Sequence, residues 1–131
     1  MRIILDASAA IEVVLDGPKA AEVARSLNEA DEVIAPDLFV SEVTNTIWKY
    51  YQLKNLNITA CDRALERGIG LVESLVPCKE LYREAFLLAR TAGGPAYDMF
   101  YLALARREDA AILTLDAALK KEAERQGIRI L

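Results

Sequence analysis

Short apolar runs recur along the chain at wide intervals. Three of them, residues 3–5, 33–35 and 111–114, contain only Ile, Leu, Val, Ala and Thr. Apolar runs this short are typical of buried strands. Residues 128–130 predict a final strand, and residues 75–77 predict an edge strand, where a proline is tolerated.

Longer amphipathic segments separate these runs. In most of them apolar residues recur three or four positions apart, which is the spacing of one helix face. The expected helices span residues 8–15, 18–30, 37–54, 59–73, 79–91, 95–107 and 117–126. Because apolar strands alternate with helices, we expect an α/β fold with a parallel sheet covered on both faces. No linker or repeat divides the chain, so residues 1–131 are predicted to form a single domain.

The helix predicted at residues 37–54 has a wide apolar face. At 100° per residue, its large apolar side chains cover an arc of roughly 180°, whereas one core contact needs roughly 100°. Trp48 and Tyr51 lie toward one side of this arc. Either both belong to the core, or this part of the helix meets another chain, where aromatic side chains are common anchors.

Composition narrows the class of protein. Of the 131 residues, 53% are hydrophobic and 27% charged, so the chain can fill a core and disorder is excluded. No apolar run approaches the roughly 18 residues of a membrane span. Residues 1–6 do not resemble a signal peptide, and we expect a cytoplasmic protein. Cys61 and Cys78 are expected to be small buried hydrophobic residues, since a disulfide between them would need an unusual redox setting.

Charge and the lack of histidine exclude several chemistries. The formal net charge of −4, from 16 Lys and Arg against 20 Asp and Glu, argues against nucleic-acid binding by bulk positive charge. It is compatible with a nuclease whose acids are neutralised by metal ions. The absence of histidine excludes Ser-His-Asp and Cys-His catalysis and histidine-bound zinc.

Acidic residues occur where the predicted strands end. Ligands of open parallel sheets bind beyond the carboxyl ends of the strands. Asp6 directly follows residues 3–5, and Asp116 lies two positions after residues 111–114. If the strands are neighbours, about 4.8 Å apart, the two carboxylates repel by about 4 kcal/mol at an effective dielectric constant of 20. Such a pair usually shares a proton or binds a cation.

Each acid also has a purely structural explanation. Asp6 and Asp116 precede helices, where aspartate is a preferred N-cap. Asp98 lies in the first turn of its helix, where the helix dipole favours an anion, although it shares a face with apolar residues. Glu42 begins a polar helix face with Asn45, where an ordinary solvated glutamate is equally reasonable. Spacing alone leaves both interpretations open.

Four motifs of the chain resemble those of the PIN domain family. The first two are Ile-Ile-Leu-Asp-Ala-Ser at residues 3–8 and Ser-Glu-Val-Thr-Asn at residues 41–45. The third and most specific is Ala-Tyr-Asp-Met-Phe-Tyr-Leu-Ala-Leu-Ala at residues 96–105. The fourth is Leu-Thr-Leu-Asp at residues 113–116, followed by a helix and a closing strand. The resemblance extends over the whole chain. The length of the chain and the form of its motifs are similar to those of VapC, the toxin half of VapBC toxin–antitoxin pairs.

The resemblance implies a three-layer α/β/α fold with a five-stranded parallel sheet in the order 3-2-1-4-5. It implies a magnesium- or manganese-dependent ribonuclease whose acidic cluster is Asp6, Glu42, Asp98 and Asp116. Supporting polar positions match Ser8, Asn45 and Thr114. Asp6 and Asp98 are expected to bind metal directly, while Glu42 and Asp116 complete the site, bind a second ion or orient the attacking water. The family also implies a homodimer and an antitoxin that covers the active site.

Elementary chemistry agrees with this interpretation. Metal ions can activate water and stabilise phosphoryl charge without histidine, and magnesium takes oxygen ligands. The candidates for contacts with RNA phosphates are the basic residues Lys49, Arg106, Arg107, Lys120 and Lys121. Two other functions stay open, namely a PIN nuclease of RNA processing without a toxin role and a non-catalytic module that binds RNA or protein.

Overall fold

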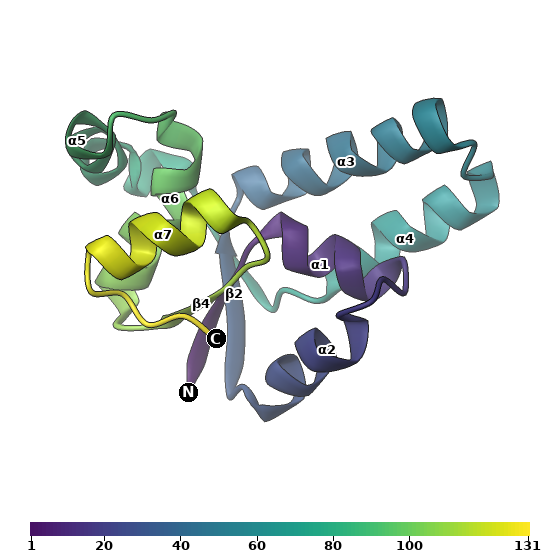
Figure 1. The fold of residues 1–131 in the computed structure, drawn as a ribbon, viewed down its shortest axis with the longest axis horizontal. Coiled ribbons are helices and arrows are strands. Elements are labelled where there is room, and N and C mark those ends of the chain that lie inside the picture. The colour runs from purple at the N-terminus through teal and green to yellow at the C-terminus, as the bar shows by residue number, and fades with distance from the viewer.

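The computed structural model describes residues 1–131 and contains a sheet of four parallel strands (Figure 1). The strands are β1 (Arg2–Leu5), β2 (Glu32–Pro36), β3 (Ser74–Val76) and β4 (Ala111–Leu113). Their order across the sheet is β3-β2-β1-β4. Ile3 of β1 is paired with Val33 on one side and with Ala111 on the other. The first and last strands of the chain are therefore neighbours in the sheet.

Helices cover both faces of the sheet. They are α1 (Ala7–Val14), α2 (Ala20–Glu29), α3 (Leu38–Lys54), α4 (Ile58–Gly70), the 3-10 helix η1 (Cys78–Glu80), α5 (Tyr82–Ala92), α6 (Ala96–Glu108) and α7 (Ala117–Arg125). In Figure 1, α1 to α4 lie on one side of the strands and α5 to α7 on the other. Helix α6 packs against β1, β2 and β4, whereas α1 packs against α2, α3 and α4. The predicted three-layer α/β/α fold is confirmed.

Burial explains why the central strands are apolar without alternation. Ile3, Ile4 and Leu5 of β1 and Ile112 of β4 are inaccessible to solvent. A strand with helices on both faces has no solvent side, so every position favours an apolar residue. Each such side chain stabilises the fold by about 1.5–3 kcal/mol relative to full exposure.

The fifth predicted strand, at residues 128–130, is reduced to a single bridge between Ile112 and Ile130. The N–H of Ile112 donates to the carbonyl of Arg129 at 2.9 Å, and the N–H of Leu131 donates to the carbonyl of Ile112 at 3.0 Å. Successive residues of a strand direct their backbone groups to opposite neighbours. Because β4 has only three residues and pairs with β1, its central residue alone turns toward the C-terminal segment. The segment therefore lies in the predicted place, beside β4, without extending into a strand.

One predicted helix also differs. The segment at residues 79–91 divides into η1 and α5, with Leu81 between them. Leu81 is buried and its φ of −118° departs from helical geometry, so the chain turns there to place this side chain in the core. The other six helices begin and end within three residues of the predicted bounds.

The apolar face of α3 is only partly used by the core. Phe39, Val43 and Ile47 are buried, whereas Trp48 is 54% exposed and Tyr51 is 46% exposed. The interpretation of Trp48 and Tyr51 as core residues is therefore wrong. Their contact with another chain stays a prediction.

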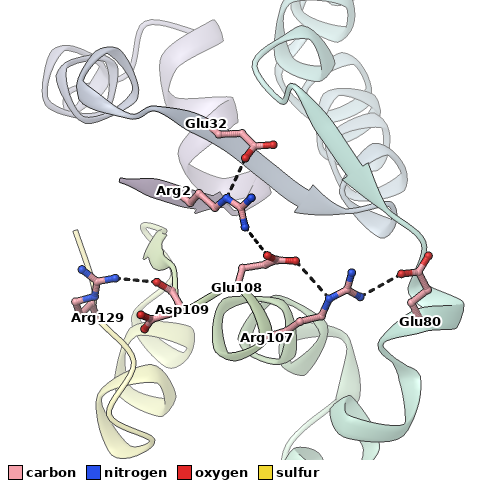
Figure 2. Close-up of polar contacts among 7 residues, drawn as sticks. All are labelled: Arg2, Glu32, Glu80, Arg107, Glu108, Asp109 and Arg129. Carbon is pink, nitrogen blue, oxygen red and sulfur yellow. Dashed lines mark hydrogen bonds and ion pairs between the residues drawn. The ribbon is translucent and has the colours of Figure 1, made fainter.

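A chain of ion pairs links four elements, namely β1, β2, α6 and η1 (Figure 2). It runs from the starts of β1 and β2 to the C-terminal end of α6, and from there to η1, which follows the end of β3. Arg2 of β1 contacts Glu32 of β2 at 3.0 Å and Glu108, at the end of α6, at 2.5 Å. Arg107 contacts Glu108 at 3.3 Å and Glu80 of η1 at 3.1 Å. Exposed pairs contribute only about 0–1 kcal/mol each, so this network adds little to the stability of the fold. Its main effect is to connect the C-terminal end of α6 to β1 and η1.

Both cysteine thiols are free, with Cys61 buried and Cys78 half-buried. This agrees with their interpretation as small hydrophobic residues rather than a disulfide. None of the helices combines the length and apolar character needed to cross a lipid bilayer.

Candidate functional site

The four predicted acids line one pocket at the carboxyl ends of the strands. Asp6 directly follows β1, and its N–H donates to the carbonyl of Leu113 at the end of β4, at 3.0 Å. Asp116 lies three residues beyond Leu113. Glu42 is in the second turn of α3, which begins just after β2, and Asp98 is in the first turn of α6. The pocket has a volume of about 400 Å³, and its lining consists of Asp6, Ala7, Ser8, Ile11, Glu12, Glu42, Thr46, Tyr50, Asp98, Leu115 and Asp116.

Two hydroxyl groups hold the carboxylate of Asp6. Its Oδ2 accepts hydrogen bonds from Ser8 Oγ at 2.6 Å and from the buried Thr114 Oγ1 at 2.7 Å. The N–H of Leu115 donates to Ser8 Oγ, and the N–H of Asp116 donates to Thr114 Oγ1, both at 3.0 Å. All the bonds of the Asp6 carboxylate end on Oδ2, which leaves Oδ1 for a ligand.

Asp116 is held by the helix that it caps. Its Oδ1 accepts hydrogen bonds from the N–H groups of Ala118 at 2.8 Å and Leu119 at 3.1 Å. Asp6 also caps a helix, through the N–H of Ser8 at 3.4 Å. The predicted capping roles are thus real, yet they use one carboxylate oxygen of each residue. Capping and membership of the acidic pocket are compatible.

Glu42 is anchored by a buried phenol rather than solvated. Tyr101 of α6, which is 0% exposed, donates its hydroxyl to Glu42 Oε1 at 2.5 Å. Burial raises the pKa of Glu42 to about 7; the hydrogen bond from Tyr101 acts in the opposite direction, and the charges of Asp6, Asp98 and Asp116 add to the rise. This carboxyl group therefore titrates near neutral pH.

Asp98 is half-buried in the wall of the pocket. Burial first, and then the charges of Asp116 and Asp6, raise the pKa of Asp98. No lysine or arginine lines the pocket to compensate these acids. The shared negative charge is the main electrostatic property of the site.

The arrangement suits a cation, although the acids do not form a complete coordination shell. In Asp6, Glu42 and Asp116 a protein donor holds one carboxylate oxygen and the other is left free. No three acidic or thiol side chains converge closely enough to constitute a ready-made metal site. Carboxylate oxygens in an uncompensated acidic pocket are the donor set that hard divalent ions prefer, so the residues fit such an ion.

Some predicted residues lie elsewhere. Asn45 is exposed and lines a neighbouring pocket instead of the acidic one. The acidic pocket contains none of the predicted phosphate contacts, Lys49, Arg106, Arg107, Lys120 and Lys121. Arg106 and Arg107 are at the far end of α6 from Asp98, where they pair with Glu84 at 3.7 Å and with Glu80.

Sequence reasoning missed two polar residues of this site. Tyr101 lies three positions after Asp98 on the same face of α6, and that shared face was the available signal. Glu12 lines the pocket as a fifth acid, but its Oε2 accepts a hydrogen bond from the N–H of Lys19 at 2.8 Å. No spacing rule would have connected Glu12 to the site.

Known proteins with similar sequences and structures agree with this architecture. Ribonuclease VapC3 of Pyrobaculum aerophilum is 29% identical over 124 residues, which cover 93% of this chain and 95% of that protein. The crystal structure of PAE2754 from Pyrobaculum aerophilum superposes with a TM-score of 0.73 at 21% identity, covering 99% of this chain and 83% of that one. VapC20 of Mycobacterium tuberculosis, a toxin that cleaves the sarcin-ricin loop, gives a TM-score of 0.66 at 14% identity, covering 91% of this chain and 93% of that one.

The family profile covers nearly the whole chain and includes every acid described above. It matches residues 3–124, from the start of β1 to the last turn of α7. The chain belongs to the PIN domain family.

Proposed function

We propose that this protein is a divalent-metal-dependent endoribonuclease and the toxin of a toxin–antitoxin pair. The observation that carries the proposal is the pocket in which Asp6, Glu42, Asp98 and Asp116 meet without any basic side chain. Its support from relatives is the similarity, over nearly the full length, to proteins named VapC ribonucleases.

Asp6 and Asp98 would hold the metal ion, magnesium or manganese, and Asp116 would complete its surroundings. A bound divalent ion lowers the pKa of water and neutralises charge on phosphoryl oxygens. The chain supplies position, since the hydroxyls of Ser8 and Thr114 keep Asp6 from rotating. Half-buried acids without cationic partners also attract a cation strongly, because each one otherwise repels its neighbours.

Glu42 is the residue best suited to handle a proton. In the metal-free pocket the pKa of Glu42 is raised to about 7, and the positive charge of a bound ion would lower this pKa and favour the carboxylate, the form that accepts a proton from water. Tyr101 holds Oε1, which leaves Oε2 to accept a hydrogen bond from the attacking water. In this scheme Tyr101 is a positioning residue and Glu42 orients or deprotonates the water.

A cleavage assay with mapped RNA ends, run with magnesium, with manganese and with EDTA, tests the proposal. Asp6→Asn and Glu42→Gln should abolish metal-dependent cleavage and leave the fold intact. Glu66→Gln, an exposed glutamate of α4, is the matched control and should keep full activity. Near-normal cleavage by either site variant would contradict the four-acid site, because loss of a cap alone costs only about 1 kcal/mol.

Two alternatives have separate outcomes. Cleavage by a chain whose gene has no small antitoxin gene beside it would favour an RNA-processing nuclease without a toxin role. Absence of bound metal and of cleavage with all four acids intact would favour a non-catalytic module.

The proposed partners are an antitoxin and a second copy of this chain. An antitoxin would place an Arg or Lys at the acids, where it pairs with carboxylates and competes with metal. The exposed Trp48 and Tyr51 of α3 are the proposed anchors of a homodimer. A second apolar surface, formed by Tyr82, Phe86 and Leu87 of α5, is the competing location. If Phe86→Glu dissociates the dimer and Tyr51→Glu does not, the dimer uses α5.

A further inference from the structure

A second pocket adjoins the acidic one and shares Glu42 with it. This tyrosine pocket has a volume of about 380 Å³ and is lined by Leu38, Ser41, Glu42, Asn45 and Tyr97. The first four residues come from α3 and Tyr97 comes from the first turn of α6. Its size falls in the range of about 300–1,000 Å³ that small-molecule sites occupy. Because Glu42 lines both pockets, a ligand chain bound in the first can extend into the second.

The side chains of the tyrosine pocket suit a planar, polar-edged ligand. Tyr97 is 70% exposed, so its ring presents a flat apolar surface to solvent. Ser41 and Asn45 are exposed as well, which leaves a hydroxyl and an amide open for hydrogen bonds. An amide side chain carries donors and an acceptor side by side and is a common reader of base edges. Leu38 adds an apolar contact.

We infer that the tyrosine pocket binds one unpaired nucleobase of the RNA, adjacent to the phosphate at the four acids. This inference rests on the proposed function. Tyr97 stacks on the base, and Asn45 and Ser41 bond to its edge. Proteins that read RNA sequence bind single-stranded segments in this way, because a splayed base exposes both its face and its edge.

An antitoxin segment is the other conceivable occupant, and the lining favours a base. A helix docked in a groove needs an extended apolar surface. Most of the surface of this pocket is apolar, which suits the face of a base, but only five residues line it, and Ser41, Asn45 and Glu42 of α3 add polar groups to it. Tyr97 and Asp98 both belong to the first turn of α6, so the tyrosine pocket and the acidic pocket lie at the same end of this helix.

The first experiment compares steady-state cleavage of a single-stranded RNA by the unaltered chain, Tyr97→Ala and Tyr97→Phe. Tyr97→Ala should raise KM roughly 5- to 150-fold, the effect of losing one base–aromatic stack. It should change kcat little, because stacking binds substrate and transition state alike. Tyr97→Phe keeps the ring and should keep KM. Ile58→Ala removes an apolar side chain of similar exposure, 69% exposed at the start of α4, and serves as the matched control.

The second experiment removes the base instead of the tyrosine. After the cleavage site has been mapped, an RNA with an abasic nucleotide beside the cleaved phosphate should lose affinity for the unaltered chain. Tyr97→Ala should be nearly insensitive to the same abasic change, because the two changes delete the same contact. Asn45→Ala should alter the base preference at this position and at no other.

The outcomes separate the subsite from the proposed function. Additive effects of Tyr97→Ala and the abasic nucleotide, or unchanged KM in Tyr97→Ala, would overturn the subsite while metal-dependent cleavage stands. Weaker neutralisation by the antitoxin with unchanged RNA cleavage would assign the pocket to the antitoxin and overturn the inference. Absence of metal-dependent cleavage by the unaltered chain would overturn the proposed function and the subsite together. A metal-induced rise in Tm that is preserved in Tyr97→Ala shows that the acidic pocket is intact in that variant.

Discussion

Removal of the Tyr101 hydroxyl should destabilise the protein in a way that depends on pH. Tyr101→Phe keeps the buried ring and deletes the donor that lies 2.5 Å from Glu42 Oε1. A hydrogen bond to a neutral acceptor contributes about 1 kcal/mol, and one to a charged acceptor about 1.5–3 kcal/mol. The substitution should therefore cost about 1 kcal/mol where Glu42 is protonated and about 1.5–3 kcal/mol where it is ionised.

The sign follows from the pKa of Glu42. In the folded, metal-free chain this pKa is raised from 4.5 to about 7, so folding favours the protonated form. The stabilising contribution is complete below pH 4.5 and is lost as the pH rises through about 7. Loss of the Tyr101 donor raises the pKa of Glu42 further, since that donor favours the carboxylate. The gap between the two proteins should thus widen as the pH rises.

Thermal unfolding in EDTA at pH 5 and at pH 8.5 measures this gap. At about 4 °C per kcal/mol for a domain of this size, Tyr101→Phe should lower Tm by about 4 °C at pH 5 and by about 6–12 °C at pH 8.5. Tyr82→Phe, on the exposed face of α5, should change neither value. In a Glu42→Gln background the pH dependence of the cost should disappear. An equal cost at both pH values would refute the reasoning, because ring packing alone is insensitive to the charge of Glu42.

Three further measurements test other parts of the structure. Magnesium or manganese should raise Tm by binding the native state, and Asp98→Asn should remove most of that rise. Asp62→Asn, at an exposed position of α4, is the control and should keep the rise. An unchanged metal response in Asp98→Asn would exclude Asp98 from the site. Thr114→Val deletes the hydroxyl that donates to Asp6 at 2.7 Å, so denaturant unfolding should show a loss of about 1–3 kcal/mol, and a loss near zero would mean that Ser8 suffices. Sedimentation at tens of micromolar should show a dimer that Trp48→Glu and Tyr51→Glu weaken, whereas a monomeric unaltered chain would contradict a dimer.

The strands and most helix bounds could be predicted because their signals are local. An apolar run such as residues 3–5 identifies a strand buried on both faces without reference to the rest of the chain. The failure at residues 128–130 has a non-local cause, since those residues are apolar enough for a strand. Their partner β4 is too short to offer more than Ile112. The sequence of the C-terminal segment itself gives no sign that its partner strand is short.

The site residues likewise divide into those with a local signal in the sequence and those whose position depends on the packing of distant elements. Asp6 and Asp116 could be placed from the rule that parallel strands end at one edge, and the structure puts both in one pocket. The partner of Glu42 could not be placed, because the angle between α3 and α6 decides which side chain of α6 reaches it. Asn45 shares the polar face of α3 with Glu42, yet three residues of helix turn it toward the tyrosine pocket.

The pairing of β1 with β4 has a consequence for the synthesis of the protein. Asp6 and Asp116 are separated by 110 positions in the sequence, and their strands meet in three registered pairs, from Ile3 with Ala111 to Leu5 with Leu113. At about 5–20 residues per second, a ribosome adds the later residue roughly 5–20 s after the earlier one. During that interval the nascent chain has β1 without its partner β4 and an acidic pocket without Asp116. Whatever chemistry the pocket performs can begin only after almost the entire chain has been translated.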